Sequence, residues 1–138
     1  MKLWPLLLVV AAPIKPEEDL AARDLKAMEG TWVVVSHEVN GKKATDAGYA
    51  TWKGIVIKGD RIHFYDKPSP IIVNPKKKPK EINVFIPEGM SADAHLKGIY
   101  ALEKDELRLC IPLSTEADRP TKFSSDNYCS LLILRRKK

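Results

Sequence analysis

The chain after residue 30 is a succession of short segments rich in β-branched and aromatic residues, separated by turn-forming residues. Asn40-Gly41 is a strong β-hairpin signal, and Gly59-Asp60 and Lys104-Asp105 mark further tight turns. No helical pattern alternates with these segments, which argues against a parallel sheet of βαβ units. The pattern predicts eight short strands, at 31–39, 51–58 (or from 49), 61–65, 71–73, 81–86, 97–103, 106–111 and 128–136.

One helix is predicted in front of these strands, from about Pro16 to Glu29. Proline suits the first helical position, and Leu25 and Met28 belong to one modest apolar stripe. Gly30 suits the residue just past a helix, where a positive φ ends it. The sequence therefore predicts a helix that leads directly into the first strand.

Eight hairpin-linked strands can close into an up-and-down antiparallel barrel, which has no free sheet edges. The predicted fold class is therefore mainly β, an eight-stranded antiparallel barrel preceded by one short N-terminal helix. Pro68 and Pro70 interrupt the fourth segment, so the sequence leaves full closure of the barrel open.

The N-terminus has the pattern of a secretory signal peptide. Met1-Lys2 is a short basic region, Leu3 to Val10 is apolar apart from a proline, and small residues follow at Ala11-Ala12. The apolar run is too short for a membrane-spanning helix. We divide the chain into a signal peptide at 1–12, a linker and helix start at 13–24, and a barrel domain at 25–138. The expected location is secreted or periplasmic, or cytoplasmic if the N-terminus is not a signal.

Several motifs resemble a known family. Leu25-Lys26-Ala27-Met28-Glu29-Gly30-Thr31-Trp32 is similar to the opening of the lipocalin-like domain found repeatedly in planctomycete bacteria, a family without an established function. Asn74 and Asn83 stand where that family usually has aspartate. The resemblance covers roughly residues 25–136 and implies a lipocalin-type barrel without catalytic residues. The other motifs that carry it, in order, are Asn40-Gly41-Lys42-Lys43, the segment 74–83, Gly98-Ile99-Tyr100, Leu107-Arg108-Leu109-Cys110, Arg119-Pro120-Thr121-Lys122-Phe123 and Leu134-Arg135-Arg136.

The Gly30-Thr31-Trp32 junction has a physical rationale within such a barrel. Glycine lets the chain turn sharply from helix to strand. Tryptophan then places a large apolar body at the base of the barrel and plugs it. The resemblance to lipocalins implies that an arginine of the last strand, Arg135 or Arg136, packs over the indole. We interpret the junction as a structural plug and not as a binding site.

A ligand site, if the protein has one, is expected inside the barrel. The period-two pattern points one side of each strand inward. The alternative is that these side chains simply fill a small barrel. The residues predicted to line the interior site are Trp52, Phe64, Val84, Tyr100, Leu109 and Leu132.

Charge and cysteine content leave further alternatives. The net charge is +5, and lysine or arginine clusters occur at 76–80 and 135–138. Such clusters bind nucleic acid or anionic lipid, or are solvated surface, which is the commoner case. No aromatic residues interleave with the lysines, so nucleic acid is not expected as a partner.

Cys110 and Cys129 either form a disulfide between neighbouring strands or are buried thiols. No metal-ligand spacing is present, so no metal or cofactor is expected.

No nucleophile, base or phosphate loop has the local setting that catalysis requires. The chain is therefore interpreted as a non-enzymatic, exported lipocalin-like domain that binds a small apolar or amphipathic ligand, or an envelope protein partner. The alternative is a structural or protein-interaction module with a packed barrel, which acts through its surface loops at 76–80 and 112–127.

Overall fold

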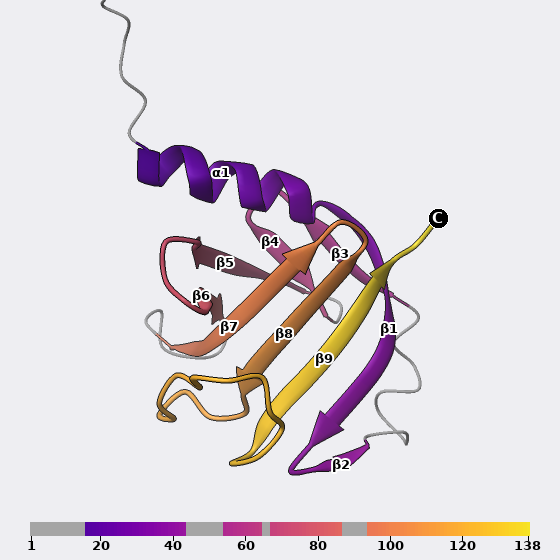
Figure 1. Ribbon diagram of the computed structural model, residues 1–138, viewed down its shortest axis with the longest axis vertical. Coiled ribbons are helices and arrows are strands. Elements are labelled where there is room, and N and C mark those ends of the chain that lie inside the picture. The colour runs from indigo at the N-terminus through magenta and orange to yellow at the C-terminus, as the bar shows by residue number, and fades with distance from the viewer. Residues whose placement is uncertain (1–15, 44–53, 65–66, 87–93) are drawn as a thin grey trace, which may run out of the picture.

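A single antiparallel sheet wraps around one core, and a helix lies across one end of it (Figure 1). The computed structural model describes residues 16–43, 54–64, 67–86 and 94–138. The predicted signal peptide and Trp52 lie outside these residues. The elements are α1 (Pro16–Met28), β1 (Gly30–Val39), β2 (Lys42–Lys43), β3 (Ile55–Lys58), β4 (Arg61–His63), β5 (Pro68–Asn74), β6 (Lys80–Phe85), β7 (His95–Glu103), β8 (Glu106–Pro112) and β9 (Cys129–Arg136).

The sheet closes on itself. Each strand from β3 to β9 pairs with its neighbour in sequence, and β1 pairs with both β3 and β9. The closing ladder runs from Trp32 opposite Arg136 to Val39 opposite Ser130. Because β2 is only a two-residue extension of the hairpin after β1, the barrel itself has eight strands. The predicted fold class, an eight-stranded antiparallel barrel behind one short helix, is confirmed.

The two ends of the barrel differ. The capped end carries α1 together with the tight turns at 59–60, 75–79 and 104–105. The distal end is where β1, β6 and β8 finish and where β5, β7 and β9 begin. Positive φ at Gly59 (60°) and Lys104 (38°) closes two of the turns at the capped end. The hairpin at Asn40 (φ 52°) and Gly41 (φ 75°) lies at the distal end, as its sequence predicts.

The barrel interior is a continuous apolar core. Met28 of α1 is fully buried in it, and Ala21 and Leu25 pack against it, so α1 covers the capped end with its apolar stripe. Alternation along the strands supplies the rest, because most inward positions on the described strands are apolar. The buried members are Met28, Trp32, Ile55, Ile57, Ile62, Ile71, Val73, Ile82, Val84, Tyr100, Leu107, Leu109, Ile111, Leu132 and Leu134.

The prediction for the fourth strand was wrong in length. The expected segment 71–73 is part of β5, which includes both prolines (Pro68–Asn74). Ile71 donates its backbone N–H to Asp60 O at 2.8 Å, on the β4 side of the strand. By alternation, the donors missing at Pro68 and Pro70 would face β6, and the ladder with β6 begins only at Ile71. The prolines therefore occupy positions at which no backbone N–H is needed for a hydrogen bond to a neighbouring strand.

Candidate functional site

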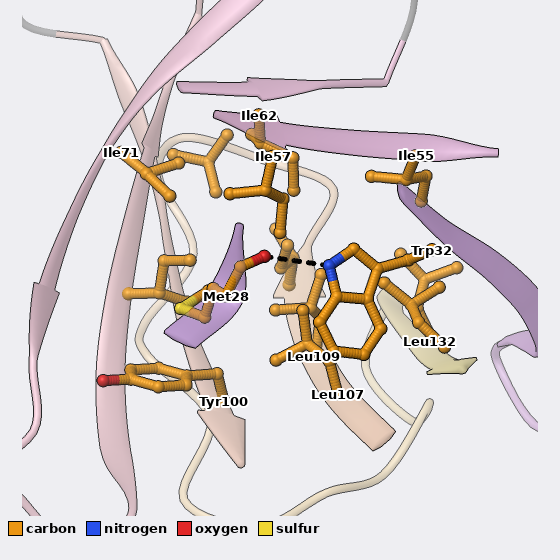
Figure 2. Close-up of a cluster of buried hydrophobic side chains, with 14 of the residues drawn as sticks. Met28, Trp32, Ile55, Ile57, Ile62, Ile71, Tyr100, Leu107, Leu109 and Leu132 are labelled. Atoms are coloured by element: carbon orange, nitrogen blue, oxygen red, sulfur yellow. Dashed lines mark hydrogen bonds between the residues drawn. The ribbon is translucent and has the colours of Figure 1, made fainter. Parts of the chain in front are cut away.

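Trp32 fills the base of the barrel at the capped end. Its side chain is 0% exposed, among isoleucines of β3 and β4 and leucines of β8 and β9 (Figure 2). Its indole Nε1 donates to Met28 O at 2.9 Å, the last carbonyl of α1. A buried indole N–H needs such an acceptor, and helix-terminal carbonyls lack intrahelical donors. One contact therefore satisfies both groups and joins α1 to β1.

Arg136 covers this junction from the other side. Its guanidinium carbon lies 4.3 Å from the centroid of the Trp32 ring. Nη1 donates to Glu29 O at 2.7 Å and Nη2 donates to Ala27 O at 2.8 Å, so the arginine also caps the end of α1. Of the two arginines implied by the resemblance, Arg136 occupies this position, whereas Arg135 is exposed on the outer surface.

Gly30 makes the approach of Arg136 feasible. Its φ is +135°, a conformation that residues with a side chain rarely adopt. A Cβ at this position would lie 3.0 Å from Nη1 of Arg136. The backbone conformation therefore favours glycine here, and a side chain would also displace the Arg136 guanidinium.

Tyr100 is held at the capped end by a polar contact. Its ring is 1% exposed within the core, and its hydroxyl donates to Oδ2 of Asp24 in α1 at 2.7 Å. Lys80 Nζ reaches the same carboxylate oxygen at 3.0 Å. Burial, and then the Asp24 carboxylate, raise the pKa of Tyr100 well above its usual range. Tyr100 thus fastens α1 to the barrel, and it is not at the distal mouth.

The other predicted ligand residues within the described chain share one interior. Val84, Leu109 and Leu132 are almost fully buried in the core, and Phe64 is partly buried against it. Partly buried members occur at both ends of the barrel, with Leu102 at the capped end and Phe64 and Leu96 towards the distal end. The predicted ligand residues within the described chain therefore share one largely buried apolar interior.

A buried histidine marks the distal end. His37 on β1 lies opposite Leu132, and its Nε2 is hydrogen-bonded to the Ser130 hydroxyl. Burial lowers the pKa of His37, because removal from water disfavours the charged imidazolium. A β-bulge between Val34 and Ser36 shifts the alternation of β1, so that the odd-numbered His37 points into the barrel. Simple alternation from Trp32 would point His37 outward, so the sequence pattern gives no signal for a buried histidine at this position.

Outside the barrel wall, a strap formed by residues 113–128 covers β7, β8 and β9. Cys110 Sγ donates to Ser124 O at 3.1 Å, and Phe123 packs on a small apolar cluster of Ile99, Cys110 and Cys129. At the distal end, Gly41 N donates to Ser125 Oγ at 2.8 Å. These contacts fix the strap to two parts of the sheet that are far apart in sequence.

Arg119 is the main polar anchor of the strap. Its Nη1 donates to Gly98 O at 2.9 Å and to Ile82 O at 3.3 Å, and its Nε lies 3.6 Å from Oε1 of Glu81. A Cβ at Gly98 would lie 2.7 Å from Cys110 O, so the glycine permits close approach of β7 and β8. The resemblance-bearing segments around Gly98, Cys110 and Arg119 therefore meet in one structural cluster.

Both cysteines are buried free thiols in the structure. They lie on neighbouring strands, as the sequence analysis supposed, and on the outer face of the barrel beneath the strap. Burial, followed by the neighbouring Cys110 thiol, raises the pKa of Cys129 to about 11. A thiol with that pKa is almost entirely protonated at neutral pH, so Cys129 has little thiolate for nucleophilic chemistry.

Surface hollows lined by described residues lie outside the barrel interior. One of about 460 Å³ is formed by the strap, with Arg119, Lys122 and Asp126 among its lining residues. One of about 640 Å³ lies between α1 and β5, lined by Ala21 and Ile72 and by residues of the following basic loop. The described residues contain no cluster of three metal-ligating side chains. No helix among them is long and apolar enough to cross a membrane.

The closed eight-stranded antiparallel barrel with a helix over one end is consistent with a calycin-like fold. No protein-family model matches the chain, and neither the curated proteins nor the solved structures provide a match.

Proposed function

We propose that this protein is a non-enzymatic lipocalin-like domain that binds a small apolar or amphipathic ligand at the distal end of its barrel. The observation that carries the proposal is the closed apolar interior, in which Phe64 and Leu96 towards the distal end are only partly covered. Apolar side chains with a few polar groups beside them are typical of a ligand site.

The polar groups at the distal end suit an amphipathic ligand. His37 and Ser130 face inward there and form a hydrogen-bonded pair next to apolar Leu132 and Ile111. An apolar ligand body would contact the leucine and isoleucine, and a neutral hydrogen-bonding group would contact the pair. Because burial disfavours a charged His37, a neutral head group fits better than a carboxylate.

The motif resemblance supports two finer parts of the proposal. We assign the chain to the planctomycete lipocalin-like family on the order and spacing of its motifs from Leu25 to Arg136. We also propose that the protein is exported to the envelope or beyond, on the pattern of residues 1–12. A fusion of residues 1–20 to alkaline phosphatase tests export, and phosphatase activity that stays cytoplasmic would contradict it.

Native mass spectrometry of the purified protein tests ligand binding. The proposal predicts a reproducible extra mass that is released on denaturation. Spectra of empty protein from repeated preparations would instead favour the second candidate function, a packed interaction module. The observation that favours this second candidate is the strap, which presents a polar hollow of about 460 Å³ on a firmly anchored loop.

A further inference from the structure

The fold gathers cations that are far apart in sequence at the capped end of the barrel. The basic loop between β5 and β6 carries exposed Lys76, Lys77 and Lys78, and the chain ends there with exposed Lys137 and Lys138. Around them lie other exposed cations, on α1 and on two turns: Arg23, Lys26, Lys58, Arg61 and Lys104.

Acidic groups at the capped end are fewer. Exposed carboxylates there belong to Glu29, Asp60, Glu103 and Asp105, and α1 begins with the acidic segment 17–19. Asp24 is less exposed and is already paired with Lys80. The distal end and the strap are more evenly charged, because they carry exposed Lys42, Lys43, Lys67 and Lys122 together with exposed Glu116, Asp118 and Asp126. The described surface is therefore polarised, with its excess of cations around α1.

Apolar groups accompany these cations. Ile72 on β5 is 58% exposed, and Leu20 on α1 is 37% exposed. Ile72 and Ala21 line the same hollow of about 640 Å³ as Lys76 and Lys77. A surface that combines lysines with exposed aliphatic side chains matches the interface of an anionic bilayer, where ammonium groups meet head groups and aliphatic groups meet the acyl boundary. Stacking of nucleic-acid bases needs aromatic side chains, and the exposed Tyr128 lies at the distal end, directly before β9.

We propose that the capped end of the barrel docks on an anionic lipid bilayer. The loop lysines Lys76, Lys77 and Lys78 contact lipid phosphates, and Ile72 contacts the upper acyl region. In this orientation α1 faces the membrane and the distal end faces away from it. The inference uses only the outer surface of the capped end, so it does not depend on a ligand in the barrel.

Vesicle co-sedimentation of the full chain tests this docking with matched charge variants. Lys77→Gln/Lys78→Gln removes two exposed charges from the capped end, and Lys42→Gln/Lys43→Gln removes two from the distal end. Each lysine near an anionic surface contributes roughly a fivefold factor, so the first variant should lose ~10-fold or more in partitioning. The second should stay within about twofold of the parent protein. Both variants share the apolar run 3–10, so any contribution from it cancels in the comparison.

Further binding measurements distinguish an anionic bilayer from other anionic partners. Binding should require phosphatidylglycerol in the phosphatidylcholine vesicles, and it should weaken as salt is raised. Ile72→Ser should reduce vesicle binding, whereas Val35→Ser, which changes a 50% exposed side chain on β1, should not. Any of three results would overturn the proposal. The two double-lysine variants could lose vesicle binding equally, or the protein could bind equally well to vesicles of phosphatidylcholine alone. The third result is retention on DNA without retention on anionic vesicles. Unchanged melting temperatures verify that the variants are folded.

Discussion

At the residue scale, Trp32 joins the core, the end of α1 and the last strand. The indole is fully buried, donates to the last carbonyl of α1 and lies beneath Arg136. Trp32→Ala should lower the free energy of unfolding by ~3–5 kcal/mol, because it leaves a large cavity and an unsatisfied helix end. Urea denaturation checks this value. Tyr128→Ala is the control, since a 68% exposed aromatic should cost less than ~0.5 kcal/mol. Similar losses in both variants would contradict the structural role of Trp32.

His37 should give the protein a stability that falls on mild acidification. The folded protein holds the pKa of His37 below the value in the unfolded chain, so the unfolded state binds protons more readily. The contribution of a neutral His37 is complete above the unfolded pKa and is lost as pH falls through that value towards the folded pKa. Between about pH 7.5 and 5.5 the loss should be at most ~1.4 kcal/mol.

Denaturation of a His37→Gln variant at both pH values isolates this effect. The variant should show a smaller fall in the free energy of unfolding between the two pH values than the parent protein does. His63→Gln serves as the matched control, because His63 on β4 is only partly buried. The same pH slope in the parent and in His37→Gln would mean that His37 does not titrate on unfolding.

At the element scale, Arg119 is a long polar anchor that joins the strap to two strands of the sheet. Arg119 reaches two sheet carbonyls, Gly98 O and Ile82 O, and these bonds hold the strap on the outer face of β6 and β7. Arg119→Met keeps the aliphatic stem but removes the donors, and should cost ~1.5–3 kcal/mol in local stability. Hydrogen exchange in peptides from 113–128 should accelerate while β8 stays protected. Lys122→Met, at an exposed strap position, is the control, and equal exchange in both variants would contradict the anchoring role.

The elements show which parts of the fold can be predicted from sequence. Turn residues at 40–41, 59–60 and 104–105 identified the hairpins, because positive φ restricts those positions to a few residue types. Pro68 and Pro70 misled the prediction for β5, since only the ladder shows that no donor is needed there. The bulge that turns His37 inward, and the bond from Arg119 to Gly98 O, arise from contacts between distant segments and leave no local pattern.

At the scale of the whole molecule, the barrel has two chemically different ends. The capped end combines the Trp32 plug and α1 with a cation-rich surface, and the distal end combines apolar side chains with the buried His37–Ser130 pair. Predicted ligand residues at the two ends therefore have different roles. Tyr100 fastens α1 through Asp24, whereas Phe64 lies where the core is incompletely covered. We therefore propose that membrane docking belongs to the capped end and ligand binding to the distal end.

Two leucines on β7 allow the most direct test of ligand binding at the distal end. Leu96 and Leu102 face the same interior and are both partly buried against the core, but Leu96 pairs with Val84 at the distal end and Leu102 pairs with Leu107 at the capped end. Each can be changed to tryptophan, which adds the same bulk at opposite ends of one strand and costs ~1–3 kcal/mol through overpacking.

The measurement is a fluorescence titration of each folded variant with the neutral apolar probe N-phenyl-1-naphthylamine. The account predicts that the parent protein binds the probe. Leu96→Trp should weaken binding ~10-fold or more by filling the mouth, because blocking one apolar contact region costs ~1–3 kcal/mol of binding free energy. Leu102→Trp should leave the Kd within about twofold of the parent value. No probe binding by the parent protein, or equal weakening by the two tryptophans, would contradict a ligand site at the distal end.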